Sequence, residues 1–238
     1  MKQIIIFPLL IVVILLTACT STGNDPVVGD LTSTIEPAQA TMAGTPAEPT
    51  PTVDYETTYG LTYMREEEKL ARDVYQVLFE KWGSRVFDNI ATSEQQHMDA
   101  IAPLLSSYFL PDPAADTLPG QFSDPTLQEL YDNLSAQGVL SLSDAFKVAA
   151  GIEEMDILDL QHFLEMDLPG DVRLVYENLL NGSYNHLSAF VTIMERQGGE
   201  IYTPQYLSAE AYQEILDLVS ASGHGSSSGG YWGGTPTP

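Results

Sequence analysis

The chain has a single cysteine, Cys19, and only nine lysine and arginine residues among its 238 residues. One cysteine excludes an internal disulfide framework and a Cys-x-x-Cys redox or metal pair. The 33 aspartate and glutamate residues bring the formal net charge to −24, which argues against a basic surface for nucleic acid or anionic lipid. Cations are the partners that such a charge favours, although most surface carboxylates serve solubility.

The sequence also has almost no stretch in which apolar and polar residues alternate, which is the pattern of a half-buried strand. Only the short stretch EIYTP, residues 200–204, has that character. The sequence therefore argues against a sheet and predicts an all-α fold.

The first residues, MKQIIIFPLLIVVILLTA, are one lysine followed by an almost unbroken apolar run. This pattern is typical of a secretory signal, and we expect residues 1–18 to be a lipoprotein signal peptide. Residues 16–19, LTAC, resemble the lipobox of bacterial lipoproteins, which implies that Cys19 is lipidated and becomes the new N-terminus. The alternative is an uncleaved anchor helix; on either interpretation the protein is extracytoplasmic and held at the cell membrane.

Two segments lack a periodic apolar face. Residues 19–57 are rich in Thr, Pro and Ala, and residues 221–238 are rich in Gly and Ser. Such compositions cannot offset the entropy of ordering, so we expect a disordered tether and a disordered tail, and His224 is interpreted as a tail residue rather than a ligand. One domain remains, residues 58–220, of a usual size for a single core.

Four long stretches of this domain have apolar residues at helical spacing. They cover residues 58–83, 84–109, from Ser141 or Ser143 to about 166, and 171–197, with shorter helical patterns at 126–138 and 208–220. Pro103 should kink the second long helix or remove a hydrogen bond from it. The pattern predicts a four-helix bundle with an extra short helix in the crossover between the second and third long helices and another at the C-terminus. The long crossover suits a ferritin-like arrangement.

Acidic and histidine side chains interrupt the apolar stripe of every long helix. Burying one carboxylate is costly unless it is paired or binds a metal, and several together would repel each other. Divalent cations would remove that conflict. In a metal-free alternative, the acids pair with Arg65, Arg72 or Arg173. The inward residues are Glu68, Glu94, His97, Glu153, Asp156 and His186.

Four motifs carry a resemblance to a known family: EKLARDVY, SEQQHM, AAGIEEMDI and NHLSAF. They resemble the ferritin-like superfamily, in particular the bacterial and archaeal domain of unknown function 2202, with rubrerythrin as a distant relative, over about residues 59–215. The resemblance implies an iron or manganese centre, with Glu68 a ligand, Glu94 bridging and His97 terminal. Glu153 and Asp156 would serve from the third long helix and His186 from the fourth.

One departure from that family pattern matters. Ferritin-like di-iron proteins usually carry Glu-x-x-His on the last long helix, whereas this chain has Ser183 three residues before His186. The site would then hold two metals asymmetrically, hold one, or hold none. The sequence also has no Cys-x-x-Cys iron site of the rubrerythrin kind, so any redox turnover needs an outside electron donor.

Two functions follow as hypotheses. The first is a membrane-anchored protein that binds one or two metal ions for oxidant or metal handling, with a possible di-iron oxidoreductase activity. The second is a metal-free helical binding or structural module of the cell envelope. For Tyr75, on the Glu68 face, we expect a packing role; the alternative is that it lies near the centre and passes an electron or a hydrogen bond. For His162 we expect a partly exposed position off the Glu153 stripe.

Overall fold

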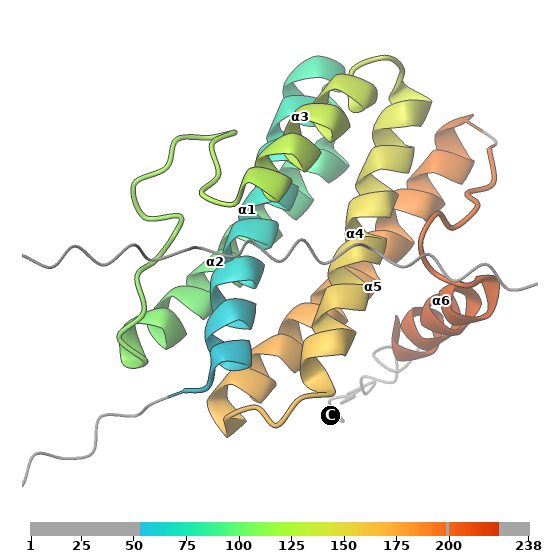
Figure 1. Ribbon diagram of the computed structural model, residues 1–238. Helices are drawn as coiled ribbons and strands as arrows, with labels where there is room; N and C mark the ends of the chain where they lie inside the picture. The colour runs from blue at the N-terminus through green and yellow to red at the C-terminus, as the bar shows by residue number, and fades with distance from the viewer. Residues whose placement is uncertain (1–52, 199, 224–238) are drawn as a thin grey trace, which may run out of the picture. The chain divides into compact units, whose positions relative to one another are not determined.

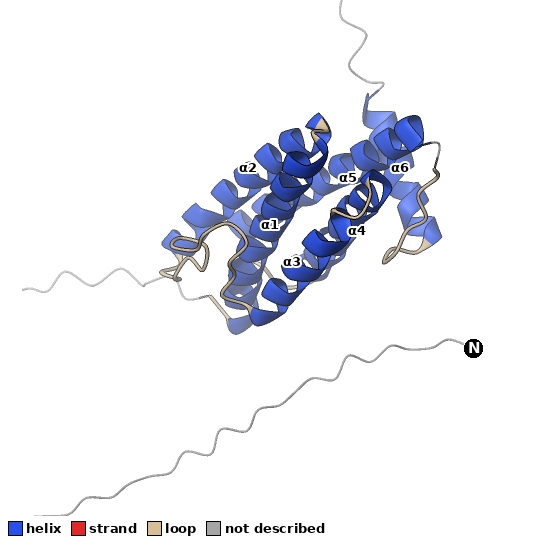
Figure 2. Ribbon diagram, turned by 90° about the horizontal axis from the view of Figure 1, so that it is seen from above, coloured by secondary structure: helices blue, strands red, loops and turns tan. Residues whose placement is uncertain are grey.

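The computed structural model describes residues 53–198 and 200–223. The expected signal peptide, Cys19 and His224 lie outside the described residues. Figure 2 draws no strand in the described part of the chain, which confirms the all-α prediction. The helices are α1 (Tyr55–Trp82), α2 (Arg85–Ser107), α3 (Pro125–Gly138), α4 (Leu142–Leu164), α5 (Gly170–Gly198) and α6 (Ala209–Gly223).

The four long helices form the predicted bundle. Helix α1 packs along α2, and α4 packs along α5, while α1–α4 and α2–α5 contacts close the bundle. The long connection that contains α3 carries the chain back to the end where α2 begins, so α2 and α4 run in the same direction (Figure 1). Helix α6 packs on α5. Among the helices of the described ranges, none combines the length and the apolar character needed to cross a membrane.

Helix caps set the bounds of the bundle helices. The Asp54 side chain accepts a hydrogen bond of 2.7 Å from the Thr57 amide, so α1 begins at Tyr55, a little before the expected position 58. Gly83 ends it in the left-handed conformation, with φ of 68°. At α4, Ser141 rather than Ser143 is the N-cap. Helix α2 continues through Pro103 to Ser107.

Helix α1 also fastens the crossover that leads to α4. The Arg65 guanidinium donates two hydrogen bonds to the Asp112 carboxylate, at 3.0 and 2.9 Å. The buried Lys69 ammonium donates to the carbonyl oxygens of Leu118 and Gln121, at 2.9 and 3.0 Å, and pairs with Asp73. The polar residues on this face of α1 are therefore explained by the loop they hold.

The core is divided into two apolar clusters. One contains Val74, Phe87 and Phe190, and the other contains Leu61 and Ile101. On α1, α2 and α5 the chain passes from one cluster to the other across a short polar stretch. On α4, Glu153 and Asp156 lie among residues of the first cluster, shortly before the second cluster begins at Leu160. We call these polar side chains the polar layer; they are Glu68, Glu94, His97, Glu153, Asp156, Ser183 and His186.

Candidate metal centre

The polar layer is buried at the middle of the bundle. Glu68, Glu94 and Glu153 are each 2% exposed, and Asp156 and His186 are 6% and 8% exposed. Helical spacing puts them there: an inward side chain recurs every third or fourth residue, so Glu94 and His97 on α2 share one face. The layer therefore collects four carboxylates away from water.

The first group of candidate ligands joins α1 and α2. The His97 Nδ1 atom lies 3.1 Å from Glu68 Oε2 and 2.7 Å from Glu94 Oε2. Three ligand atoms, one from each residue, fall within 4.8 Å of one another. This spacing suits a single cation held by two carboxylates and one imidazole.

The second group joins α2, α4 and α5. The His186 Nδ1 atom lies 2.8 Å from Glu94 Oε1 and 3.6 Å from Glu153 Oε2. These three residues again offer ligand atoms within 4.8 Å of one another. Glu94 belongs to both groups and turns one oxygen toward each histidine, which is the geometry of a carboxylate that bridges two cations.

Several polar atoms of the layer have no hydrogen-bond partner although they are buried. Glu94 Oε1 and His186 Nδ1 are among them despite their close approach, because they are not aligned for a hydrogen bond. Unpartnered buried polar atoms are rare in folded proteins and call for a missing ligand. In the polar layer these atoms are Glu68 Oε1, Glu94 Oε1, Asp156 Oδ1 and His186 Nδ1.

The electrostatics of the layer show carboxylates that compete for positive charge. Burial raises the pKa of Glu68 to about 7, although the charge of His97 opposes the rise. Burial would also raise the pKa of Glu94, but the charges of both histidines outweigh it and lower the pKa to about 2. Burial likewise raises the pKa of Glu153, and the charge of Glu94 adds to the rise. Without a cation, the layer must bind protons instead.

In the metal-free layer, protonated His97 and His186 supply the positive charge that the carboxylates need. Burial would lower the pKa of His97, yet the charge of Glu68 and contacts with Glu94 raise it to about 12. Burial would also lower the pKa of His186, but the charges of Glu94 and Glu153 outweigh it and raise the pKa to about 10. Their rings lie roughly parallel, with centroids 5.4 Å apart.

Three further residues support the layer; a hydrogen bond from Tyr75 was the alternative to its packing role, and the parts of Ser93 and Gly182 were not predicted from the sequence. The Tyr75 hydroxyl donates a 2.6 Å hydrogen bond to Glu153 Oε1, so this tyrosine orients a carboxylate as well as packing against Phe190. Ser93 Oγ lies 2.9 Å from His186 Nε2 and fixes that ring. A Cβ atom added at Gly182 would lie 2.6 Å from His97 Nε2, so glycine leaves the space that this ring occupies. The only signal in the sequence was the helical register of Tyr75 with Glu68.

Asp156 and Ser183 form a pair beside the two groups. The Ser183 hydroxyl donates to Asp156 Oδ2, and both residues are buried. Asp156 is not in either group of close ligand atoms. Burial raises the pKa of Asp156 well above its ordinary value, and the charges of Glu68 and Glu153 raise it further, so Asp156 shares the electrostatics of the layer.

The three arginines of the metal-free alternative contact other groups. Arg65 binds Asp112, Arg72 binds Asp73 and Gln95, and Arg173 donates to backbone carbonyls. The described contacts therefore give the layer no arginine counter-charge. His162 is exposed, as expected.

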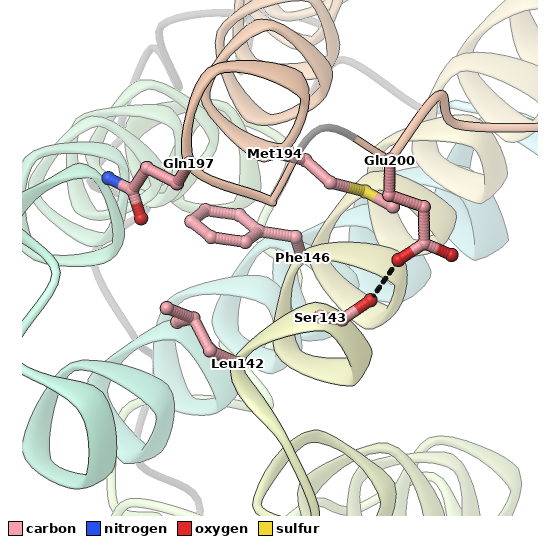
Figure 3. Close-up of a pocket in the computed structure, with 6 residues that line it drawn as sticks. All are labelled: Leu142, Ser143, Phe146, Met194, Gln197 and Glu200. Carbon is pink, nitrogen blue, oxygen red and sulfur yellow. Dashed lines mark hydrogen bonds between the residues drawn. The ribbon is translucent and has the colours of Figure 1, made fainter.

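A small apolar pocket lies elsewhere in the bundle, at the beginning of α4 and the end of α5. Figure 3 shows Phe146 and Met194 lining it, with Ser143 hydrogen-bonded to Glu200 at its edge. Its volume is about 110 Å³, and none of the polar-layer residues lines it. It is a separate feature from the candidate metal centre.

Comparison with known proteins places this arrangement in a family. Residues 57–219 match the uncharacterized protein domain DUF2202. The uncharacterized protein MJ0754 of Methanocaldococcus jannaschii is 49% identical over 164 residues, which is 69% of this chain and 88% of that protein. The crystal structure of hypothetical protein MJ0754 from Methanococcus jannaschii DSM 2661 has a TM-score of 0.68 and 47% identity, over 72% of this chain and 97% of that chain. The chain therefore belongs to the DUF2202 domain family.

Proposed function

We propose that this protein is an extracytoplasmic, membrane-anchored metal-binding protein of ferritin-like type. Its centre would hold two ions of iron or manganese through the polar layer, for the handling of an oxidant or of the metal itself. The observation that carries the proposal is that Glu94 is shared by two groups of ligand atoms, each completed by a histidine and a further glutamate.

The residues present fit such ions. Carboxylate oxygens and imidazole nitrogens suit iron and manganese, and a bundle core is a usual place for them. Glu68 with His97 would hold one ion, Glu153 with His186 the other, and Glu94 both. When bound, the metal would supply Lewis-acid and one-electron chemistry toward dioxygen or peroxide.

The chain's own residues have defined parts around the metal. Tyr75 orients Glu153 by the hydrogen bond that its hydroxyl donates to Oε1. Ser93 keeps the His186 ring turned so that Nδ1 faces Glu94 and Glu153. The apolar clusters on both sides limit the access of water. The resemblance to the lipobox at Cys19 supports the membrane anchor in this proposal.

Elemental analysis tests the proposed function. Full-length protein purified in detergent from metal-replete cells should contain about two iron or manganese ions per chain, as in other carboxylate bundles. The double variant Glu94→Gln, His97→Ala should lose most of this metal while circular dichroism shows that the helices remain. Protein without metal would support a metal-free helical module instead. A double variant with as much metal as the wild type would show that the ligands are assigned to the wrong residues.

A further inference from the structure

Three tyrosines follow one another along the first turns of α1. Tyr55, Tyr59 and Tyr63 are spaced by four residues, so their side chains lie one above another on the same face. The centroids of the Tyr55 and Tyr59 rings are 6.3 Å apart, those of the Tyr59 and Tyr63 rings are 5.6 Å apart, and both pairs are stacked. These are the distances of interacting aromatic pairs. We call the three residues the tyrosine stack.

The tyrosine stack leads from solvent into the bundle. Tyr55 is 75% exposed and Tyr59 is 42% exposed, whereas Tyr63 is half-buried. On α4, Phe163 lies beside the two inner rings, with centroids 6.2 Å from Tyr59 and 6.3 Å from Tyr63. The inner end of the stack is therefore packed between helices, while its outer end is open to molecules in solution.

The inner end meets polar residues that reach the candidate metal centre. The Tyr63 hydroxyl donates a 3.2 Å hydrogen bond to Asp159 Oδ2, and Asp159 is hydrogen-bonded to Glu67. Glu67 directly precedes the candidate ligand Glu68. Tyr63 itself lies five residues before Glu68, which is roughly 7.5 Å along the helix axis. The stack thus ends close to the polar layer without belonging to it.

The surroundings of Tyr63 suit the chemistry of a phenol that is oxidised. A phenol that loses one electron also loses its hydroxyl proton. Burial raises the pKa of Tyr63, and the charges of Glu67 and Asp159 raise it further, so the hydroxyl keeps its proton until the ring is oxidised. The Asp159 carboxylate already accepts the hydrogen bond and is placed to take that proton.

We propose that the tyrosine stack carries electrons, one at a time, from a reductant at the surface to the candidate metal centre. This inference rests on the proposed function, because it gives that centre a route to the outside electron donor that a chain without a Cys-x-x-Cys iron site needs. The reductant is a small hydrogen-atom donor of the phenol or hydroquinone class, and the oxidant at the centre is hydrogen peroxide.

Electrons and protons balance along this route. Tyr63 gives one electron toward the centre and its hydroxyl proton to Asp159. Tyr59 then returns an electron to Tyr63, which takes its proton back from Asp159, and the Tyr59 proton passes to water. Tyr55 restores Tyr59 in the same way, and the reductant restores Tyr55 with one electron and one proton. Two such transfers, with two protons from water, reduce one hydrogen peroxide to two molecules of water.

Tyr75 is the competing candidate for an oxidised residue. Its hydroxyl contacts Glu153 directly, but the residue is fully buried. Its ring lies against Phe190, which lies against Phe87, and phenylalanine has no hydroxyl and is not readily oxidised. The described ring contacts of Tyr75 therefore offer no oxidisable route to solvent. This contrast favours the tyrosine stack.

The test begins with detection of the radical. Full-length protein is loaded with Fe²⁺ without oxygen, freed of unbound iron, mixed with hydrogen peroxide and frozen for electron paramagnetic resonance. The wild type should form an organic radical whose signal narrows when the protein carries ring-deuterated tyrosine. Tyr63→Phe should slow radical formation by at least about tenfold, with the iron content unchanged. The matched control is Tyr206→Phe, at an exposed tyrosine outside the stack, and it should behave as the wild type does.

Variants of Tyr59 separate electron transfer from packing. Tyr59→Phe keeps the stacked ring but removes the oxidisable hydroxyl, so hydroquinone should reduce the radical at least about tenfold more slowly. Tyr59→Trp should restore most of the wild-type rate, because indole is also readily oxidised. A stack that serves packing alone predicts the wild-type rate in Tyr59→Phe.

Two kinds of failure are distinguishable. Iron-loaded wild type without a tyrosine radical, a wild-type rate in Tyr59→Phe, or a radical that Tyr75→Phe removes and Tyr63→Phe leaves overturns this inference, while the metal centre stays intact. A wild-type chain that binds no iron overturns the proposed function and this inference with it.

Discussion

At the scale of single residues, the candidate centre depends on side chains whose partners come from other helices. Glu94 lies between two histidines, only one of which is on its own helix. The inward position of Glu94 and His97 could be predicted, because helical periodicity is local. The role of Gly182 could not, because it depends on how closely α5 approaches His97.

Gly182 provides a prediction at this scale. Alanine in place of a helical glycine usually stabilises a helix by about 1 kcal/mol. Here the added Cβ would lie 2.6 and 2.7 Å from two atoms of the His97 ring, so the ring must move away from Glu68 and Glu94. We expect Gly182→Ala to lose at least half of the bound metal in elemental analysis, with helix content unchanged.

Gly170→Ala is the matched control for that experiment. Gly170 belongs to the same helix, and a Cβ atom added there meets nothing within 4 Å. The control should keep the wild-type metal content. Full metal content in Gly182→Ala would mean that the His97 ring does not need its present position.

At the scale of elements, one turn of α1 performs three tasks. Glu66 accepts hydrogen bonds from the backbone amides of Ser123 and Asp124, at 2.5 and 3.0 Å, Glu67 faces Asp159, and Glu68 faces His97. Successive helical residues point about 100° apart, so three adjacent glutamates meet three different surroundings.

The sequence predicted this helix and its inward face but not its contacts with the crossover. Periodicity placed Glu68 with Met64 and Tyr75 on the inward face, because apolar neighbours mark that side. Nothing local distinguishes a glutamate that binds a loop from one that faces solvent, so the attachment of the crossover to Glu66 could not be foreseen. The pairing of Ser183 with Asp156 was equally hidden, because it depends on the packing of α4 against α5.

Glu66 gives a prediction that separates folding from metal binding. Glu66→Ala removes the acceptor for two amides of the crossover and should lower the free energy of unfolding by about 2 kcal/mol. The metal content should stay at the wild-type level, because the Glu66 carboxylate binds the crossover rather than the polar layer. Urea unfolding and elemental analysis measure the two effects.

The exposed Glu80, on the same helix, provides the comparison. Glu80→Ala should change the stability by no more than about 0.5 kcal/mol. Metal loss in Glu66→Ala without a change in stability would assign that glutamate to the centre and contradict its role as an anchor.

At the scale of the whole molecule, the bundle confines a set of like charges between two apolar clusters. In the metal-free protein, protons must compensate that charge. The pKa values of Glu68, His186 and His97, at about 7, 10 and 12, all exceed the ordinary values of 4.5 for glutamate and 6.5 for histidine. The folded chain therefore holds more protons than the unfolded chain between about pH 5 and pH 8.

The direction of the pH dependence follows from this difference. Stability falls with rising pH wherever the folded state binds more protons than the unfolded state. We expect the metal-free protein, in a chelator, to lose roughly 2 kcal/mol or more between about pH 5.5 and pH 8, since one pKa unit corresponds to about 1.4 kcal/mol. Excess Mn²⁺ should reverse the trend, because cations replace the protons most readily where the carboxylates are ionised. Thermal unfolding at both pH values measures this.

Glu68→Gln distinguishes the polar layer from the general acidity of the chain. The formal charge of −24 also destabilises the folded state as pH rises, and that effect remains when one carboxylate is removed. If the polar layer contributes, metal-free Glu68→Gln should lose less free energy of unfolding than the metal-free wild type over the same pH interval. Equal losses of unfolding free energy in the two proteins would mean that Glu68 does not take up a proton in the folded state.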